Sequence, residues 1–429
     1  MPHPLEDELS RRIFRKVAWR LIPFLCLLYI FNILDRANVG FARVSMQDDL
    51  GMSPAVFDWG FGLFYLGYLV FEVPSNLLLR KVGARRWIAR IMISWGIVSC
   101  ATLAVTGGTG FCLLRILLGV AEAGFFPGII LYLTYWFPAR ERARVIAWFM
   151  TAIAVSHIFG SLMSGSIMQF LHESGGLKDW QWLLLLEGIP SILLGFGVLF
   201  LLTDRPKDAK WLSTEERDWL IKRMEREEKE RTIQHQAHRL QAMFEWRVWL
   251  LIAIYFTVAM GSNAAGAYFP SLIKKQFQEL DIFEIGLLNA LPHLCAIVGM
   301  TLLSIHSDRT GERRQHVAFA AFLAGLGWVL SYASSPSLVL IGFCIAQTGM
   351  MSMLPIFWTL PTSYLSGVAA AGGIALINSV ANLGGLTGPY ILGQLGSWSM
   401  AGILFIGAGL ALAVRTESPR QTSERSEHV

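Results

Sequence analysis

Four ionisable residues inside apolar stretches are the side chains of this sequence best suited to chemistry. Asp35 and Arg36 are adjacent and follow the apolar run LIPFLCLLYIF, while Arg115 and Glu122 lie seven residues apart in a second apolar run. A spacing of seven is two helical turns, so Arg115 and Glu122 share one face of a helix. A charge at the centre of a bilayer costs roughly 2.5 to 3.5 kcal/mol, so these residues must face a partner or a wet cavity.

Two interpretations of the four charges remain open at this point. Pairs of salt bridges, Arg115 with Glu122 and Asp35 with Arg36, could simply fix the helices against each other. Alternatively, an arginine holds the carboxylate of a substrate, because the guanidinium group suits carboxylates through bidentate geometry. A nearby carboxylic acid would then carry a proton, and a hypothesis follows in which protonated Glu122 releases Arg115 to the substrate.

The elements that position these residues are membrane-spanning helices. Of the 429 residues 54% are hydrophobic and 16% are charged, whereas soluble domains have about 25% charged residues. The mean hydropathy is +0.49. Apolar runs of about 20 residues are long enough to cross a bilayer as helices. We predict an all-α membrane protein with twelve spans, at 18–40, 56–79, 87–106, 109–136, 144–169, 181–203, 247–271, 283–306, 315–333, 337–359, 364–392 and 396–414.

Basic residues accumulate in alternate loops, which predicts the orientation. They lie before span 1, and after spans 2, 4 and 8: Arg11, Arg12, Arg15 and Lys16; Arg80, Lys81, Arg85 and Arg86; Arg140, Arg142 and Arg144; and Arg309, Arg313 and Arg314. The positive-inside rule then puts both termini in the cytoplasm of a multi-pass inner-membrane protein. Topology therefore explains the net charge of +5 better than nucleic-acid binding does.

A long polar segment divides the chain into two halves with matching loops. We predict a six-helix bundle at 1–203, a cytoplasmic linker at 204–246, and a second six-helix bundle with a short tail at 247–429. The loops NLLLRKVGARR and SIHSDRTGERR each carry a basic residue, a glycine and paired arginines. Such internal duplication favours a transporter with two pseudo-symmetric bundles. The loop residues singled out are Arg80, Gly83, Arg85, Asp308, Arg309 and Gly311.

The linker contains a predicted amphipathic helix. Ser213 and Glu216 have the spacing of a capping box, and Trp219, Leu220 and Met224 follow at helical intervals. The helix is either a cytoplasmic latch or a solvated tether between the bundles.

Several motifs resemble those of the major facilitator superfamily. The loop DRTGERR is similar to the cytoplasmic loop signature of that superfamily, and RILLG is similar to its fourth-span arginine motif. The segments LDRANVGFA, VPSNLLLRKVGARRW, RILLGVAEAGFFPGIILYLTYWFP and LEGIPSILLG resemble its anion:cation symporters. Those symporters include tartrate, phthalate, hexuronate and galactonate permeases, the vesicular glutamate transporters and sialin. The fifth-span segment GSLMSG lacks the proline of drug antiporters, which argues against drug efflux.

The resemblance implies roles for residues in both halves. In family members the acids that match Asp35 and Glu122 are implicated in proton coupling, and the bases that match Arg36 and Arg115 in anion binding. An asparagine of the eleventh span contacts substrate hydroxyls in similar transporters. Our substrate-binding candidates are therefore Arg36, Arg115, Tyr65, Tyr68, Trp358, Asn378 and Asn382, of which the two tyrosines share one face with Glu72.

Other polar residues within spans are expected to have structural roles. His157 and His293 would form hydrogen-bonded packing contacts, and Asn263 is a weaker candidate for the substrate site. Glu187, at the start of span 6, is expected to be structural and to lie away from the four charges.

Several chemistries have no motif in the sequence. The five cysteines form no CxxC pair, which argues against a disulfide framework or a metal site. No GxxxxGK[ST] loop suggests ATP hydrolysis, and no HExxH or GxSxG motif suggests an enzyme. We expect no cofactor.

The sequence thus predicts a secondary transporter that imports a small organic anion by proton symport with alternating access. A hydroxylated mono- or dicarboxylate such as tartrate or a sugar acid is the first substrate class, and an aromatic acid such as phthalate is the second. An anion exchanger or facilitator without proton coupling and a non-transporting membrane sensor are the alternatives. The expected partners are the anion, protons and the lipid bilayer, and the protein is expected to function as a monomer.

Overall fold

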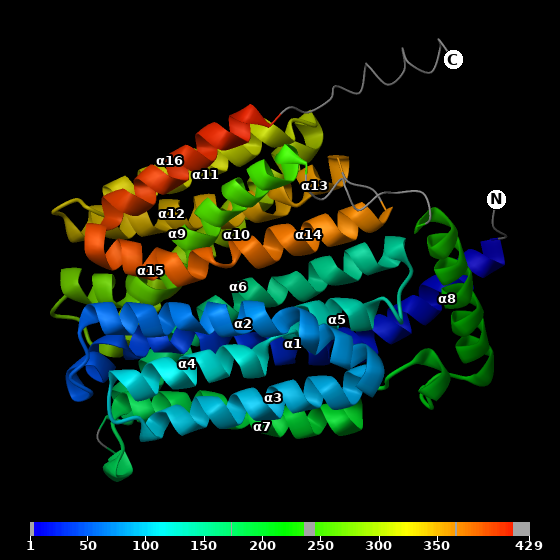
Figure 1. The fold of residues 1–429 in the computed structure, drawn as a ribbon, viewed down its shortest axis with the longest axis horizontal. Coiled ribbons are helices and arrows are strands. Elements are labelled where there is room, and N and C mark those ends of the chain that lie inside the picture. Colours follow the sequence, from blue (N-terminus) through cyan, green and yellow to red (C-terminus); the bar gives the residue numbers. More distant parts are fainter. Residues whose placement is uncertain (1–3, 173, 236–244, 365–366, 415–429) are drawn as a thin grey trace. The chain divides into compact units, whose positions relative to one another are not determined.

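The computed structural model of the protein describes residues 4–172, 174–235, 245–364 and 367–414. Among these residues every regular element is a helix (Figure 1), which confirms the predicted all-α class. The chain forms two compact units, and each is described by itself. Unit 1 comprises Met1–Ala237, Asn263–Leu294 and Gly385–Gln394, and unit 2 comprises His238–Ser262, Cys295–Gly384 and Leu395–Val429. The units follow packing, whereas the predicted division at 203 and 247 follows the chain and stays a prediction.

Unit 1 is built around the first eight α-helices. They are α1 (Pro4–Asp49), α2 (Pro54–Val82), α3 (Ala84–Ala101), α4 (Gly108–Glu122), α5 (Phe125–Leu133), α6 (Ala139–Phe170), α7 (Asp179–Leu201) and α8 (Thr214–His235), with short turns η1 (Thr102–Ala104), η2 (Ser174–Gly176) and η3 (Pro206–Asp208). Helix α2 packs along α4, α3 packs along α7, and α1 packs against α6 and α7. The four charged residues of the sequence lie on α1 and α4.

The predicted fourth span is two helices rather than one. Helix α4 ends at Glu122, and α5 begins at Phe125 after Gly124, whose φ is +84°. A φ in this left-handed region favours glycine. The break leaves Glu122 at the carboxyl end of α4, inside the bundle, with an exposed fraction of 0%.

Helices of the second half of the chain complete both units. They are α9 (Trp246–Gln276), α10 (Ile282–Thr310), α11 (Arg313–Leu330), α12 (Pro336–Phe357), α13 (Thr359–Tyr364), α14 (Gly367–Ala381), α15 (Gly384–Leu395) and α16 (Ser397–Ala413). In unit 2, α11 packs against both α12 and α16. A Cβ atom on Gly327 would overlap the backbone at Ala346, so glycine allows α11 and α12 to approach closely.

The helices account for the twelve predicted spans. Within the part of the chain that the structure describes, nine helices are long and apolar enough to cross a membrane. The other three predicted spans, 315–333, 364–392 and 396–414, correspond to α11, to α14 with α15, and to α16. The twelve-span interpretation is therefore consistent with the helices observed.

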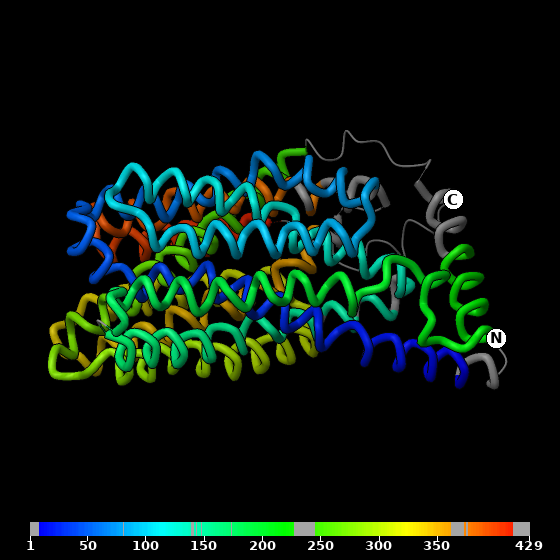
Figure 2. Tube along the Cα trace, turned by 90° about the horizontal axis from the view of Figure 1, so that it is seen from below, coloured from blue at the N-terminus to red at the C-terminus, as the bar shows by residue number. Residues whose placement is uncertain are grey.

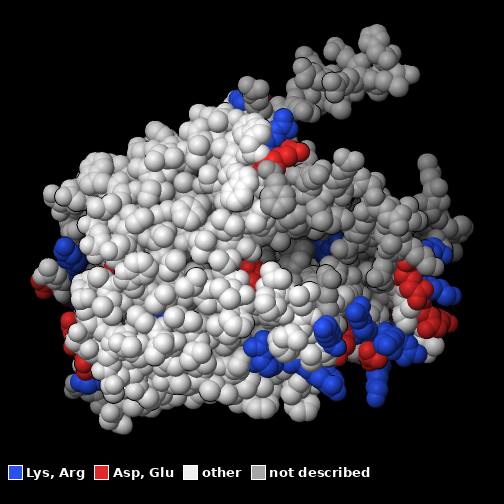
Figure 3. Space-filling model, in the orientation of Figure 1, with Lys and Arg blue, Asp and Glu red and all other residues white. Residues whose placement is uncertain are grey.

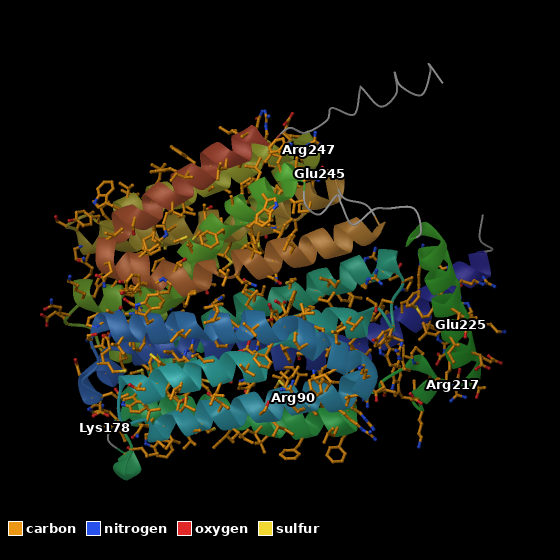
Figure 4. The ribbon with its side chains drawn as sticks, viewed as in Figure 1. Arg90, Lys178, Arg217, Glu225, Glu245 and Arg247 are labelled. Carbon is orange, nitrogen blue, oxygen red and sulfur yellow. The ribbon has the colours of Figure 1, made fainter. Side chains whose placement is uncertain are left out.

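The surface of unit 1 separates apolar and charged regions. Large apolar side chains such as Leu193 and Phe200 of α7 are exposed, as expected of residues that face lipid. In Figure 3 lysine and arginine side chains gather at the end of unit 1 next to α8. Lys178, labelled at the opposite end in Figure 4, pairs with Asp49 at 3.6 Å.

The linker helix α8 docks on unit 1. In Figures 1 and 2 it lies beside the N-terminal part of α1. The Nζ atom of Lys16 on α1 is 2.6 Å from Glu216 Oε2, and Leu220 is fully buried. The ring of Trp219 meets that of Phe14 edge-on at 5.7 Å. The described part of the helix is thus attached to α1, while most of its other side chains are exposed.

Glu216 joins the cap of α8 to this docking contact. Its backbone N–H donates to Ser213 Oγ at 3.2 Å, and its carboxylate accepts from the Ser213 backbone N–H at 3.0 Å. The hydrogen bonds from Lys16 and Ser213 lower the pKa of the Glu216 carboxyl group. This contribution to stability is therefore present at neutral pH and is lost as the pH falls below the ordinary glutamate value of about 4.3.

We expect Glu216→Ala to release α8 from α1. The substitution removes the Glu216 half of the capping box and its ion pair with Lys16. Hydrogen–deuterium exchange of 214–224 at neutral pH should become several-fold faster. The matched control is Glu215→Ala, an exposed residue of the same turn, and equal exchange in the two variants would contradict the docking role of Glu216.

Candidate functional site

An ion pair between α1 and α4 forms the centre of the candidate site. Arg36 contacts Glu122 Oε1 through both Nε and Nη2, and Asn32 Nδ2 donates to the same oxygen at 2.6 Å. Asn32 and Arg36 lie four residues apart on one face of α1, so both reach the end of α4. The charge of Glu122 is therefore paired with Arg36, a partner that neither of the two predicted salt bridges supplied.

Arg115 lies close by without a carboxylate among the described residues. Its side chain is 2% exposed, and its Nη2 atom donates to the Phe61 carbonyl oxygen at 3.4 Å. The guanidinium carbon is 5.3 Å from the ring centroid of Phe61 and 5.0 Å from that of Phe64. Its Nε and Nη1 atoms are buried and have no acceptor in the described part of the chain. Leaving buried charged donors unpaired is costly, and an anion placed beside them would satisfy both atoms.

The tyrosines of α2 form one wall of this site. Arg36 stacks on the ring of Tyr68 at 5.0 Å, and the two side chains are also hydrogen-bonded. The hydroxyl of Tyr65 donates to Asn263 Oδ1 in the part of α9 that belongs to unit 1. The site therefore joins Arg36, Arg115, Glu122 and both tyrosines, together with Asn263, which the sequence had ranked lower.

Asp35 faces away from this group. Its carboxylate accepts from the indole N–H of Trp95 on α3, from Ser99 Oγ at 3.1 Å and from Ser191 Oγ of α7 at 3.0 Å. Adjacent residues of a helix are about 100° apart, so Asp35 and Arg36 cannot share one face. The four charges are thus divided between an arginine site and a separate Asp35 cluster.

Glu187 belongs to the Asp35 cluster. It is fully buried on α7, and Ser164 Oγ of α6 donates to its Oε1 atom at 2.8 Å. Asn38 donates to Asp35 Oδ1 at 3.4 Å and also interacts with the Glu187 carboxyl group. The expectation that Glu187 lies away from the charged residues is wrong, because α7 crosses α1 at this depth.

A second buried ion pair was missed by the sequence analysis. Arg43 Nη1 donates to Asp58 Oδ1 at 2.8 Å, and the two side chains are 4% and 0% exposed. Tyr268 of α9 accepts from Arg43 Nη2 at 2.8 Å and donates to Asp58 Oδ2 at 2.7 Å. The predicted span 18–40 left Arg43 in a loop, whereas α1 continues to Asp49. The signal was present, because Arg43 lies seven residues after Arg36 on the same face.

His157 and His293 stack on each other between α6 and α10. Their ring centroids are 4.4 Å apart and their planes differ by 1°. Asn289 Nδ2 donates to Ser161 Oγ at 2.8 Å one turn away on each helix. These contacts fit the expected packing role of both histidines.

The predicted C-terminal candidates lie in unit 2. The ring of Trp358 meets that of Tyr255 at 5.0 Å, roughly edge-on. Asn378 and Asn382 are half-buried, one turn apart, and the Asn382 backbone N–H donates to the Asn378 carbonyl oxygen at 3.0 Å. Their roles in substrate binding stay predictions.

The first-half loop closes onto the end of α7. Gly83 has φ +96° and joins α2 to α3. The Arg85 backbone N–H donates to Asp204 Oδ1 at 2.8 Å, and the Arg85 side chain donates to the Leu199 carbonyl oxygen at 3.4 Å. The side chain of Arg80 lies outside the described residues.

The second-half loop is held within itself. Arg313 Nη1 is 2.6 Å from Asp308 Oδ1, and Gly311 turns the chain with φ +72°. Arg309 is exposed. The two loops match in sequence but pair their arginines with acids at different places in the chain.

Comparisons with known proteins agree with this architecture. The family model described as "Major Facilitator Superfamily" matches residues 25–389 and 251–428. A protein of Agrobacterium vitis named "Putative tartrate transporter" is 48% identical, covering 98% of this chain and 95% of its own. The "Quinolone resistance transporter" of Acinetobacter baumannii is 37% identical, covering 93% and 92%.

A solved structure with the same fold is the xylose transporter XylE from E. coli in an inward open conformation. The TM-score is 0.71 at 14% identity, with 94% of this chain and 97% of that chain covered. The helices, the loop motifs and the family match together identify this chain as an integral membrane transporter, not an enzyme, that belongs to the Major Facilitator Superfamily.

Proposed function

We propose that the protein imports a small organic anion together with protons. The observation that carries the proposal is Arg115, a buried arginine whose Nε and Nη1 atoms have no acceptor in the described part of the chain. An anion with carboxylate oxygens would satisfy both donors in the bidentate geometry that guanidinium groups favour. Arg36 lies in the same site and could bind a second anionic or hydroxyl group.

The ion pair between Arg36 and Glu122 offers a route to proton coupling. A proton on Glu122 would remove its charge and weaken its hold on Arg36, which would then be available to the anion. The hypothesis from the sequence was that protonated Glu122 releases Arg115, but the arginine in contact with Glu122 is Arg36. Binding of the anion and of the proton would therefore favour each other, as symport requires.

A hydroxylated mono- or dicarboxylate is the substrate class that we favour. Two arginines and the hydroxyl group of Tyr68 supply donors for carboxylate and hydroxyl oxygens. The tartrate name of the relative from Agrobacterium vitis supports the same class. An aromatic acid such as phthalate is the next candidate.

Drug export is the second candidate function, because a 37% identical relative is named for quinolone resistance. An uptake screen in proteoliposomes separates the two. Import of tartrate or a sugar acid, driven by an imposed pH gradient, supports the proposal. Protonophore-insensitive uptake would instead indicate an exchanger or facilitator.

We propose that the protein lies in the inner membrane with both termini in the cytoplasm, and that a single chain carries out transport.

Alternating access needs an end of the bundle that opens and closes. The ion pair between Arg43 and Asp58, together with Tyr268, is our candidate for the closure on the periplasmic side. At this closure α1 and α9 touch through glycine, because a Cβ atom on Gly40 would overlap the carbonyl oxygen of Gly266.

Replacement of Arg115 by lysine should weaken anion binding. Lysine keeps the charge but loses the planar pair of donors, and hydrogen bonds to charged groups contribute about 1.5 to 3 kcal/mol. The thermal shift produced by the transported anion should therefore require about tenfold more ligand or more. Arg90→Lys is the control, since Arg90, labelled in Figure 4, is a half-buried arginine of α3 whose guanidinium group lies over the ring of Trp87. Equal losses in both variants would contradict a specific role of Arg115.

Glu122→Gln should abolish proton-driven accumulation of the anion but leave exchange of the anion across the membrane intact. Glutamine keeps the hydrogen-bonding shape but cannot gain or lose the coupling proton. We expect anion exchange between the two sides to persist, while accumulation driven by a pH gradient falls to the level seen with protonophore. Normal proton-driven accumulation by Glu122→Gln would exclude Glu122 as the coupling acid.

Gly40→Ala and Gly266→Ala form a matched pair that tests the proposed closure. A Cβ atom on Gly40 overlaps the opposite backbone, whereas one on Gly266 meets nothing within 4 Å. Overpacking costs about 1 to 3 kcal/mol, so Gly40→Ala should slow transport about tenfold by disfavouring the closed state. Gly266→Ala should transport at close to the normal rate, and equal rates in the two variants would refute the contact as a closure.

A further inference from the structure

We propose that Glu187 is a second proton-carrying residue of transport, and that Glu187 and Asp35 together hold one proton. This inference rests on the proposed proton symport. It assigns to the EGIP segment of α7 a part in coupling, where the sequence indicated a structural role. The two buried carboxyl groups have different surroundings.

Asp35 has the surroundings of an ionised carboxylate. Both of its oxygens accept two hydrogen bonds each, Oδ1 from Asn38 and Ser99, and Oδ2 from Trp95 and Ser191. An ionised carboxylate accepts hydrogen bonds and donates none, so four donors suit it well. Asp35 is 1% exposed, and these donors replace the water it has lost.

Glu187 has the surroundings of a neutral acid. Its Oε1 atom accepts from Ser164, whereas its buried Oε2 atom has no partner in the described residues. The Oδ1 atom of Asn38 is likewise a buried acceptor without a donor in the described part of the chain. A proton on Glu187 would turn one of these unpaired acceptors into a donor, which removes the cost of leaving both unmatched.

The two acids act on each other through short connections. Asn38 contacts both carboxyl groups, and the charge of Asp35 acts directly on Glu187. Ser191, which donates to Asp35, lies one turn after Glu187 on α7 and is 3.5 Å from its carbonyl oxygen. Two carboxyl groups that share a site cannot both be ionised without strong repulsion, so one proton between them is the favoured state.

No described lysine, arginine or histidine pairs with either acid. The groups that face the pair are Ser99, Trp95 and Cys100 from α3, Ser164 from α6 and Asn38 from α1. Glu122 and Arg115 act on Asp35 only electrostatically. Since no cationic side chain among the described residues contacts either acid, a proton on Glu187 would remove one of the two negative charges of the cluster.

A close backbone contact between α3 and α7 lies beside the cluster. A Cβ atom on Gly96 of α3 would lie 2.9 Å from the carbonyl oxygen of Gly188, the residue that follows Glu187. Helices that approach so closely leave no room for water between them. Loss of the proton from Glu187 would place two unscreened negative charges between α1 and α7. Protonation of Glu187 is thus expected to control how α1, which carries Arg36, packs against α7.

The test compares Glu187→Gln and Glu187→Asp with the unmodified protein in proteoliposomes. Glutamine mimics the protonated acid and keeps the packing, so anion binding by thermal shift and anion exchange should change less than twofold. Accumulation driven by a pH gradient should fall at least fivefold, and the dependence of uptake on pH should flatten. Glu187→Asp keeps an ionisable group and should restore a pH-dependent accumulation.

Two results would overturn the role of Glu187. One is a Glu187→Gln protein with normal accumulation and a normal pH profile. The other is equal loss of exchange and accumulation in Glu187→Gln that Glu187→Asp does not rescue, because that pattern indicates packing. If the unmodified protein shows no proton-driven accumulation, the proposed symport itself fails together with this inference. The three results are distinguishable because each depends on a different comparison.

Discussion

The cost of burying charge among apolar helices is the constraint on which the rest of this structure depends. Two arginines of α1 are paired with carboxylates: Arg36 with Glu122, and Arg43 with Asp58. Arg115 is not paired in this way, because its Nε and Nη1 atoms have no acceptor among the described residues. A transporter can tolerate that deficit if the anion supplies the missing acceptors during each cycle. An incomplete site in one state is therefore useful to a protein that must bind and release.

Helix α1 brings the two charged regions together. One face carries Asn32, Arg36 and Arg43 toward α2, α4 and α9, and another carries Asp35 and Asn38 toward α3 and α7. A movement of α1 would shift the side chains of both regions at once. In the proposed symport, this arrangement would link protonation of the Asp35 cluster to anion binding beside Arg36 and Arg115.

Small residues and helix breaks set how close the charged groups can come. Because Gly40 has no side chain, the backbone of α9 can approach α1 closely, and Gly96 allows the backbone of α7 to approach α3 in the same way. The left-handed Gly124 ends α4, so that Glu122 sits at a helix end within reach of α1. The positions of the charges thus depend on glycines that carry no charge themselves.

The sequence by itself determined the helical class, the family and the residues that carry charge within the spans. Hydrophobic runs and loop motifs are local properties of the chain, so length and composition suffice to find them. It also identified Arg36, Arg115, Glu122, Tyr65 and Tyr68, which the fold brings into one site. The sequence did not identify which side chains these residues contact, because contacts between helices depend on how each helix is rotated and where it crosses its neighbours.

Only the tertiary structure decided which acid pairs with which base. It turned Asp35 away from Arg36, joined Glu187 to Asp35, and placed Arg43 with Asp58 inside the bundle rather than in a loop. A helix shows the order and face of its residues in its sequence, but the face that meets a given neighbour depends on packing across the whole bundle. Spacing along the chain therefore predicts candidates, and contacts between helices decide their pairing.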